Sequence, residues 1–95
     1  MSAYIIVDVA VTDPERYDTY KQLAAPTVGA FDGEYVVRGG NAETLEGDWS
    51  PGRVVVLRFP SLERAKEWWS SGTYADAKAM RHAASNSKMI VVEGV

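Results

Sequence analysis

Five side chains in this sequence have types and spacings that suit the binding of a small anionic or aromatic molecule. They are Tyr20, Arg38, Glu46, Trp49 and Arg81. Arginine offers paired N–H donors to a carboxylate, and aromatic rings offer apolar walls. We therefore predict that these residues line a pocket that binds a small carboxylate or an oxygenated aromatic, between the sheet and the helices of the fold.

The same residues permit two other interpretations. In the first, the protein is a cofactor-free isomerase, lyase or monooxygenase-like enzyme acting on a small organic acid, with Glu46 as proton acceptor and Arg38 and Arg81 as anchors for negative charge. In the second, the protein is a structural dimer. Arg38 and Glu46 bracket the double glycine Gly39-Gly40 and pair with each other to hold the loop, while Trp49 covers the edge of the core.

Other catalytic groups are scarce. The only histidine, His82, follows Arg81 on a predicted helix and points about 100° away from the inner face, so we expect it to act neither as a general base nor as a haem ligand. The serines that could serve as nucleophiles fall at predicted helix ends or turns, where capping explains them: Ser70, Ser71, Ser85 and Ser87. The chain has no cysteine, and we expect no metal and no cofactor.

Length and charge narrow the class of protein. A chain of 95 residues predicts one domain, residues 1–95, whose small core favours oligomerisation. Ten Lys and Arg against thirteen Asp and Glu, spread without blocks, argue against nucleic acid as a partner. No apolar run is long enough to cross a bilayer and no basic leader precedes the first strand, so we expect no membrane partner and a cytoplasmic location.

Periodicity predicts the elements that must position the site. Runs rich in β-branched residues indicate four strands, over residues 4–11, 34–38, 53–59 and 88–93. Between the first two strands, Asp13 caps a helix that we expect to break near Pro26. Between the last two, Ser61 caps a helix that is interrupted at Gly72.

The order β-α-β-β-α-β predicts an α+β fold, the ferredoxin-like βαββαβ sandwich, with a four-stranded antiparallel sheet and the helices on one face. Right-handed crossovers place the first and third strands side by side in the middle of the sheet, and we expect these two strands to run parallel. Asp8 and Arg58 then form a cross-strand pair, or both simply reach solvent.

The first and third strands are apolar on both faces. Ile5, Val7 and Val9 alternate with Tyr4 and Ile6, and the helices can cover only one of these two sets. No element remains in the chain to cover the second face. We therefore expect a homodimer formed through the sheet face.

Taken over nearly its whole length, the chain resembles the domain-of-unknown-function family 1330, in the dimeric α/β-barrel superfamily. The residues that carry the resemblance are Tyr4-Ile5-Ile6, Asp13-Pro14, Tyr17, Tyr20, Gly33, Arg38-Gly39-Gly40, Leu45-Glu46-Gly47-Asp48-Trp49, Phe59-Pro60-Ser61, Ala65, Trp68, Tyr74, Arg81 and Glu93-Gly94. The resemblance implies a ferredoxin-like protomer whose sheet packs on that of a second copy to form a dimeric α/β barrel. It assigns no catalytic residue, and the wider superfamily includes cofactor-free monooxygenases, muconolactone-type isomerases and haem enzymes.

Overall fold

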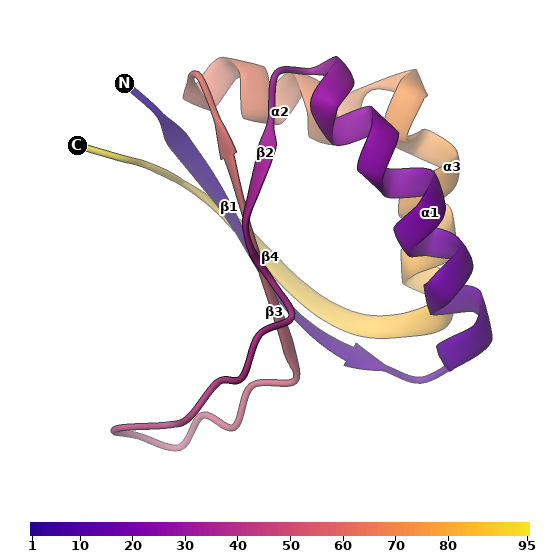
Figure 1. The fold of residues 1–95 in the computed structure, drawn as a ribbon, viewed down its shortest axis with the longest axis vertical. Coiled ribbons are helices and arrows are strands. Elements are labelled where there is room, and N and C mark those ends of the chain that lie inside the picture. The colour runs from indigo at the N-terminus through magenta and orange to yellow at the C-terminus, as the bar shows by residue number, and fades with distance from the viewer.

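The protein has two layers, a four-stranded sheet and three helices that all pack on one face of it (Figure 1). The computed structural model describes all 95 residues. The strands are β1 (Ala3–Val11), β2 (Glu34–Arg38), β3 (Arg53–Phe59) and β4 (Ser85–Glu93), and the helices are α1 (Pro14–Ala30), α2 (Leu62–Ser70) and α3 (Gly72–Ala84). The predicted α+β fold and the order of its elements are confirmed.

The helix boundaries follow from local hydrogen bonds. The side chains of Asp13, Ser61 and Ser71 each accept from a backbone N–H in the first turn of α1, α2 and α3, at 3.1–3.2 Å. Ser71 lies between α2 and α3, so the interruption predicted at Gly72 is real. Ser85 lies at the end of α3, as predicted, and its hydroxyl donates to the carbonyl of Arg81 at 2.7 Å. Ser87 was placed wrongly in a turn, because it lies in β4.

Helix α1 does not break near Pro26, contrary to the prediction. Proline removes one helical N–H donor, but hydrogen bonds of the neighbouring Thr27 side chain hold the turn that contains it. The hydroxyl of Thr27 donates to the carbonyl of Ala24 at 2.6 Å and accepts from the indole N–H of Trp68 in α2 at 3.0 Å. This contact with α2 keeps α1 continuous from residue 14 to residue 30.

The sheet has the order β2-β3-β1-β4, and every neighbouring pair is antiparallel. The predicted adjacency of β1 and β3 is confirmed, but their predicted parallel direction was wrong. β1 and β2 run the same way, and the chain reverses between β2 and β3. In the antiparallel register, Asp8 lies opposite Val54 and Arg58 lies opposite Tyr4. The predicted Asp8–Arg58 pair is therefore absent, and Arg58 pairs with Glu34 on β2 instead.

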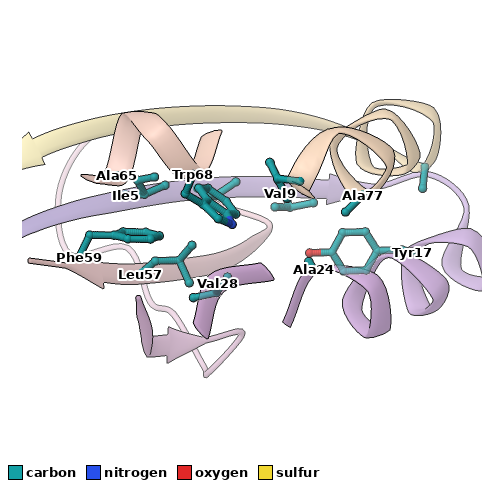
Figure 2. Packing of buried hydrophobic residues seen from close by; sticks show 13 residues of the cluster. Ile5, Val9, Tyr17, Ala24, Val28, Leu57, Phe59, Ala65, Trp68 and Ala77 are labelled. Carbon is teal, nitrogen blue, oxygen red and sulfur yellow. The ribbon is translucent and has the colours of Figure 1, made fainter. Parts of the chain in front are cut away.

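The core fills the space between the sheet and the helices (Figure 2). Trp68 of α2 is its centre: its ring stacks on Tyr74 of α3 with centroids 4.0 Å apart and lies 5.5 Å from the ring of Phe59 on β3. Val28 of α1 and Ile5 of β1 are also almost fully buried in this layer. The packing fixes α1, α2 and α3 over the inner face of the sheet.

The opposite face of the sheet has no cover within the chain (Figure 1). Strand pairing places Ile90, Ile6 and Val56 in one row across β4, β1 and β3, with Val92 and Tyr4 on one side of this row and Val54 on the other. We call this surface, made by Tyr4, Ile6, Val54, Val56, Ile90 and Val92, the outer face. Ile90 is 59% exposed. None of the three helices combines the length and hydropathy that crossing a membrane would require.

A long segment, residues 39–52, connects β2 to β3 and projects from the sheet on the side away from the helices (Figure 1). We call it the arm. All its residues except Pro51 are exposed. One carboxylate attaches its base to the sheet, because Asp8 accepts from the indole N–H of Trp49 and the backbone N–H of Gly52, both at 2.8 Å.

Candidate functional site

The five residues predicted to form a pocket lie in three different places. Tyr20 and Arg38 line the same space between α1 and the sheet. Glu46 and Trp49 lie on the exposed arm, and Trp49 is held by Asp8. Arg81 is buried on α3. Only Tyr20 and Arg38 therefore contribute directly to a shared pocket wall.

The structural pair predicted between Arg38 and Glu46 does not form. The ion pairs of the protein involve other residues. The guanidinium of Arg38 lies over the ring of Tyr35, with its Cζ 4.4 Å from the ring centroid. The chain takes a positive φ of 73° at Gly39 and then enters the arm, so Glu46 lies on a segment that projects away from the sheet.

Positive charge gathers at the mouth of the space under α1. Lys21 of α1, Arg38 of β2 and Arg53 of β3 line a cavity of about 480 Å³ whose only carboxylate is Asp18. Asp18 pairs with Lys21 at 3.0 Å, which leaves both arginines without a carboxylate partner. We call this space the outer cavity. It is a shallow depression that is largely open to solvent, and its formal charge is +2, from three cations and one carboxylate.

Behind the outer cavity lies an inner chamber walled by tyrosines. Lys21, Arg38 and Arg53 line both spaces, and Tyr17, Tyr20 and Tyr35 form much of the inner wall. The inner chamber measures about 20 Å³, room for a single water molecule. A ligand larger than water therefore has space in the outer cavity and can direct only a small polar group toward the tyrosines.

Tyr17 and Tyr35 stay protonated at neutral pH. Burial raises the pKa of the Tyr17 and Tyr35 hydroxyls, and the neighbouring Arg53 and Arg38 only partly oppose this effect. The rings of Tyr17 and Tyr20 lie 5.3 Å apart. The site therefore presents neutral hydroxyl groups, which can donate or accept hydrogen bonds, next to fixed positive charge.

Arg81 reaches the inner chamber only through other side chains. Its Nη1 donates to the hydroxyl of Tyr74 at 3.0 Å, and that hydroxyl lies 3.0 Å from the hydroxyl of Tyr20. Burial raises the pKa of Tyr74 far above its usual range, so Tyr74 is a neutral link in this chain. Arg81 and Tyr74 thus hold the hydroxyl of Tyr20 in position. Arg81 itself does not line the inner chamber or the outer cavity.

Arg53 is the residue that sequence reasoning missed. It begins β3, its Nε is buried without a hydrogen-bond partner, and its Cζ lies 5.8 Å from the ring centroid of Tyr17. One sequence feature could have pointed to Arg53, namely the double glycine Gly39-Gly40. The backbone at Gly39 passes so close to the guanidinium of Arg53 that a Cβ there would collide with it.

The side chains that line the outer cavity carry a net positive charge suited to holding an anion. Two arginines and a lysine can donate hydrogen bonds to a carboxylate, and the tyrosine hydroxyls can form hydrogen bonds with a second polar group. No carboxylate or histidine is placed to remove a proton, because Asp18 is engaged by Lys21, Glu46 is on the arm, and neither Glu46 nor His82 lines the cavities. His, Asp and Glu side chains do not gather in groups of three that could hold a metal ion.

Comparison with solved structures identifies the class as a ferredoxin-like α+β protein. A protein of unknown function from Rhodopseudomonas palustris is 20% identical with a TM-score of 0.81, over 99% of this chain and 82% of that one. A dimeric ferredoxin-like protein of unknown function from Jannaschia sp. CCS1 is 11% identical with a TM-score of 0.73, over 99% of this chain and 100% of that one. SnoaB, a cofactor-independent oxygenase from Streptomyces nogalater, is 10% identical with a TM-score of 0.65, over 99% and 93%.

The family follows from the sequence itself. The domain of unknown function DUF1330 matches residues 2–95, and the chain belongs to this family. The resemblance noted from its motifs is thus confirmed. No curated protein matches the chain. Since the solved structures share no more than 20% identity with it, they establish the fold and leave the ligand to be argued from the cavity.

Proposed function

We propose that this protein binds a small carboxylate or an oxygenated aromatic acid in the outer cavity. One observation carries the proposal: Arg38 and Arg53 line the same cavity and neither has a carboxylate partner. Arg53 is half-buried, Arg38 is exposed beside it, and neither has a carboxylate partner, so both guanidinium groups are available to bind an anion. The ligand's acid group would lie between these guanidinium groups, and its ring or chain would lie over the adjacent surface of α1.

The inner chamber adds selectivity to this proposal. Its volume of about 20 Å³ excludes a ring but accepts one hydroxyl or carbonyl oxygen. Tyr17 and Tyr35 are neutral and lie behind the arginines, so an oxygen that enters the chamber finds hydrogen-bond partners. A hydroxylated aromatic acid whose hydroxyl is adjacent to the carboxylate, such as 2-hydroxybenzoate, should therefore bind more tightly than benzoate, which lacks the second polar group.

Thermal unfolding in the presence of ligand tests this function. Benzoate and, to a larger extent, 2-hydroxybenzoate should raise the Tm, because a ligand that binds only the folded state stabilises it, and neutral benzamide should not. Arg53→Met should remove the shift. Arg58→Met is the matched control, since Arg58 lies on the same strand, pairs with Glu34 and lines neither cavity. If Arg53→Met keeps the full shift, or if benzamide produces it equally, the proposed anion site is wrong.

We also propose that the protein is a homodimer that buries the outer face against a second copy. Six large apolar or aromatic side chains share this face, and no helix of the chain covers it. Two structural neighbours are described as dimeric and ferredoxin-like. The arm projects on the same side as the outer face, so it would lie beside the second copy.

A second candidate function is that of a cofactor-free oxygenase or related enzyme acting on a small aromatic acid. The observation that favours it is the positive charge beside neutral phenols, since fixed cations stabilise negative charge that develops on a bound substrate. SnoaB, described as a cofactor-independent oxygenase, has the same fold. Oxygen consumption with hydroxylated aromatic acids, measured with wild type and Arg53→Met, separates catalysis from simple binding. Tight binding without oxygen uptake would contradict the oxygenase function and support ligand binding only.

A further inference from the structure

Arg81 is the one charged side chain that the fold buries, and it has no counter-ion. It is 3% exposed, and none of the ion pairs of the protein includes it. Its Nη1 donates to Tyr74 at 3.0 Å and contacts the sulfur of Met89 at 3.7 Å, and its Nη2 lies 3.1 Å from Nε2 of His82. Its Nε has no partner. A guanidinium cannot shed its proton, so the buried charge is left uncompensated.

A second cavity, of about 500 Å³, opens beside this charge between α2, α3 and the sheet, at β1 and the edge strand β4. Arg81 and Met89 form part of its wall. Ile5, Ala65 and Val91 make the wall largely apolar, and Lys66 supplies a second cation. The cavity is large enough for a small organic molecule, and it combines an apolar lining with the two positive charges.

This cavity is separate from the outer cavity. The two share no lining residue, and the second cavity meets the inner chamber only at Met89. Arg53 belongs to the first site and Arg81 to the second. A ligand in one therefore need not affect the other directly.

We propose that the second cavity is a binding site for an apolar monocarboxylate, such as a medium-chain fatty acid. The carboxylate would lie against the Arg81 guanidinium and supply the missing negative charge, with Lys66 contributing at the rim. The alkyl chain would cover Trp69 and Val91, two apolar lining side chains that keep accessible surface. The site does not depend on the function proposed for the outer cavity.

Met89 explains how the carboxylate reaches a charge that is buried in the unliganded protein. The sulfur at 3.7 Å is a weak acceptor and the weakest partner of Arg81. Methionine has a flexible side chain, and Met89 lines the cavity itself. A carboxylate can displace the sulfur from Nη1 without disturbing the stronger bond to Tyr74.

NMR of the arginine Nε–H groups tests the site with hexanoate as the probe. Hexanoate should shift the Arg81 Nε–H resonance in a saturable way, and neutral hexanamide should not. The resonance is assigned by its loss in Arg81→Met. That variant should fold, because no carboxylate is left unpaired when the charge is removed. Lys66→Met should weaken binding about two- to fivefold, as expected for one exposed ion pair, and Lys88→Met on the outer side of β4 should not.

The same spectra separate this site from the proposed function. A shift of the Arg53 Nε–H resonance alone would place hexanoate in the outer cavity and overturn the second site. An equal response to hexanamide would show that charge is not recognised, which overturns it as well. If Arg81→Met does not fold, Arg81→Lys replaces it as the variant. The wild-type titration decides the question in either case, since the Arg81 signal must move.

Discussion

The hydroxyl of Tyr74 links Arg81 to Tyr20, and its removal should destabilise the protein more than removal of either neighbouring hydroxyl. In Tyr74→Phe, Arg81 loses its only oxygen partner and Tyr20 loses its hydrogen bond to Tyr74. A hydrogen bond from a charged donor contributes about 1.5–3 kcal/mol and a neutral one about 0.5–1.5 kcal/mol. The expected loss in the free energy of unfolding is therefore about 2–4.5 kcal/mol.

Two further variants make this prediction specific. Tyr20→Phe removes only the neutral bond and should cost about 0.5–1.5 kcal/mol. Because that bond is already absent in Tyr74→Phe, the double variant should cost little more than Tyr74→Phe alone, so the two effects should not add. Tyr35→Phe is the control, since the Tyr35 hydroxyl has no hydrogen-bond partner within the protein and should change stability by no more than about 0.5 kcal/mol.

Urea unfolding at one fixed protein concentration measures these differences. The same loss should lower the Tm by about 4–8 °C for each kcal/mol in a domain of this size. If Tyr74→Phe costs no more than Tyr20→Phe, the hydroxyl does not support the buried charge of Arg81. Fully additive effects of the two substitutions would show that the two hydroxyls are not bonded to each other. Either outcome refutes the network.

Three other predictions concern the dimer, the arm and the single histidine. Light scattering should give a dimeric mass for wild type and a monomeric mass for Val56→Glu, which places a charge in the outer face; a monomeric wild type at micromolar concentration would contradict the dimer. Hydrogen bonds from Trp49 and Gly52 lower the pKa of Asp8 below its usual 3.8, so this attachment holds at neutral pH and is lost as pH falls through that lowered pKa. The Trp49 indole resonance should then move, and in Asp8→Asn it should no longer titrate. Burial and the adjacent Arg81 lower the pKa of His82, so its NMR titration should have a midpoint below 6.5; a higher midpoint would contradict the packing described.

Much of the fold could be predicted from the sequence because its signals are local. Alternation and β-branched runs gave all four strands, and capping side chains at Asp13, Ser61 and Ser71 mark where the helices begin. The direction of β3 was mistaken, although the reversal between β2 and β3 determines it. The continuity of α1 through Pro26 depends on Trp68 of α2, a contact that no local pattern reveals.

The site was less predictable because it depends on distant side chains and on the path of the arm. Tyr20 and Arg38 were identified by type, and both line the inner chamber. Glu46 follows a segment whose direction is fixed only by Asp8 on another strand, so its distance from Arg38 could not be inferred. Arg53 looked like the first residue of a strand, and only the close approach of Gly39 shows that its guanidinium occupies the cavity wall.

The position of β1 has a consequence for how the protein is made. β1 lies between β3 and β4, and its register with β4 runs from Ala3 opposite Glu93 to Val11 opposite Ser85. During synthesis, β1 can therefore pair with β4 only after almost the whole domain has been made. Until residues 85–93 leave the ribosome, the exposed edge of β1 is open to wrong partners, including other nascent chains. Productive folding of this domain is expected to occur after its last strand has been synthesised.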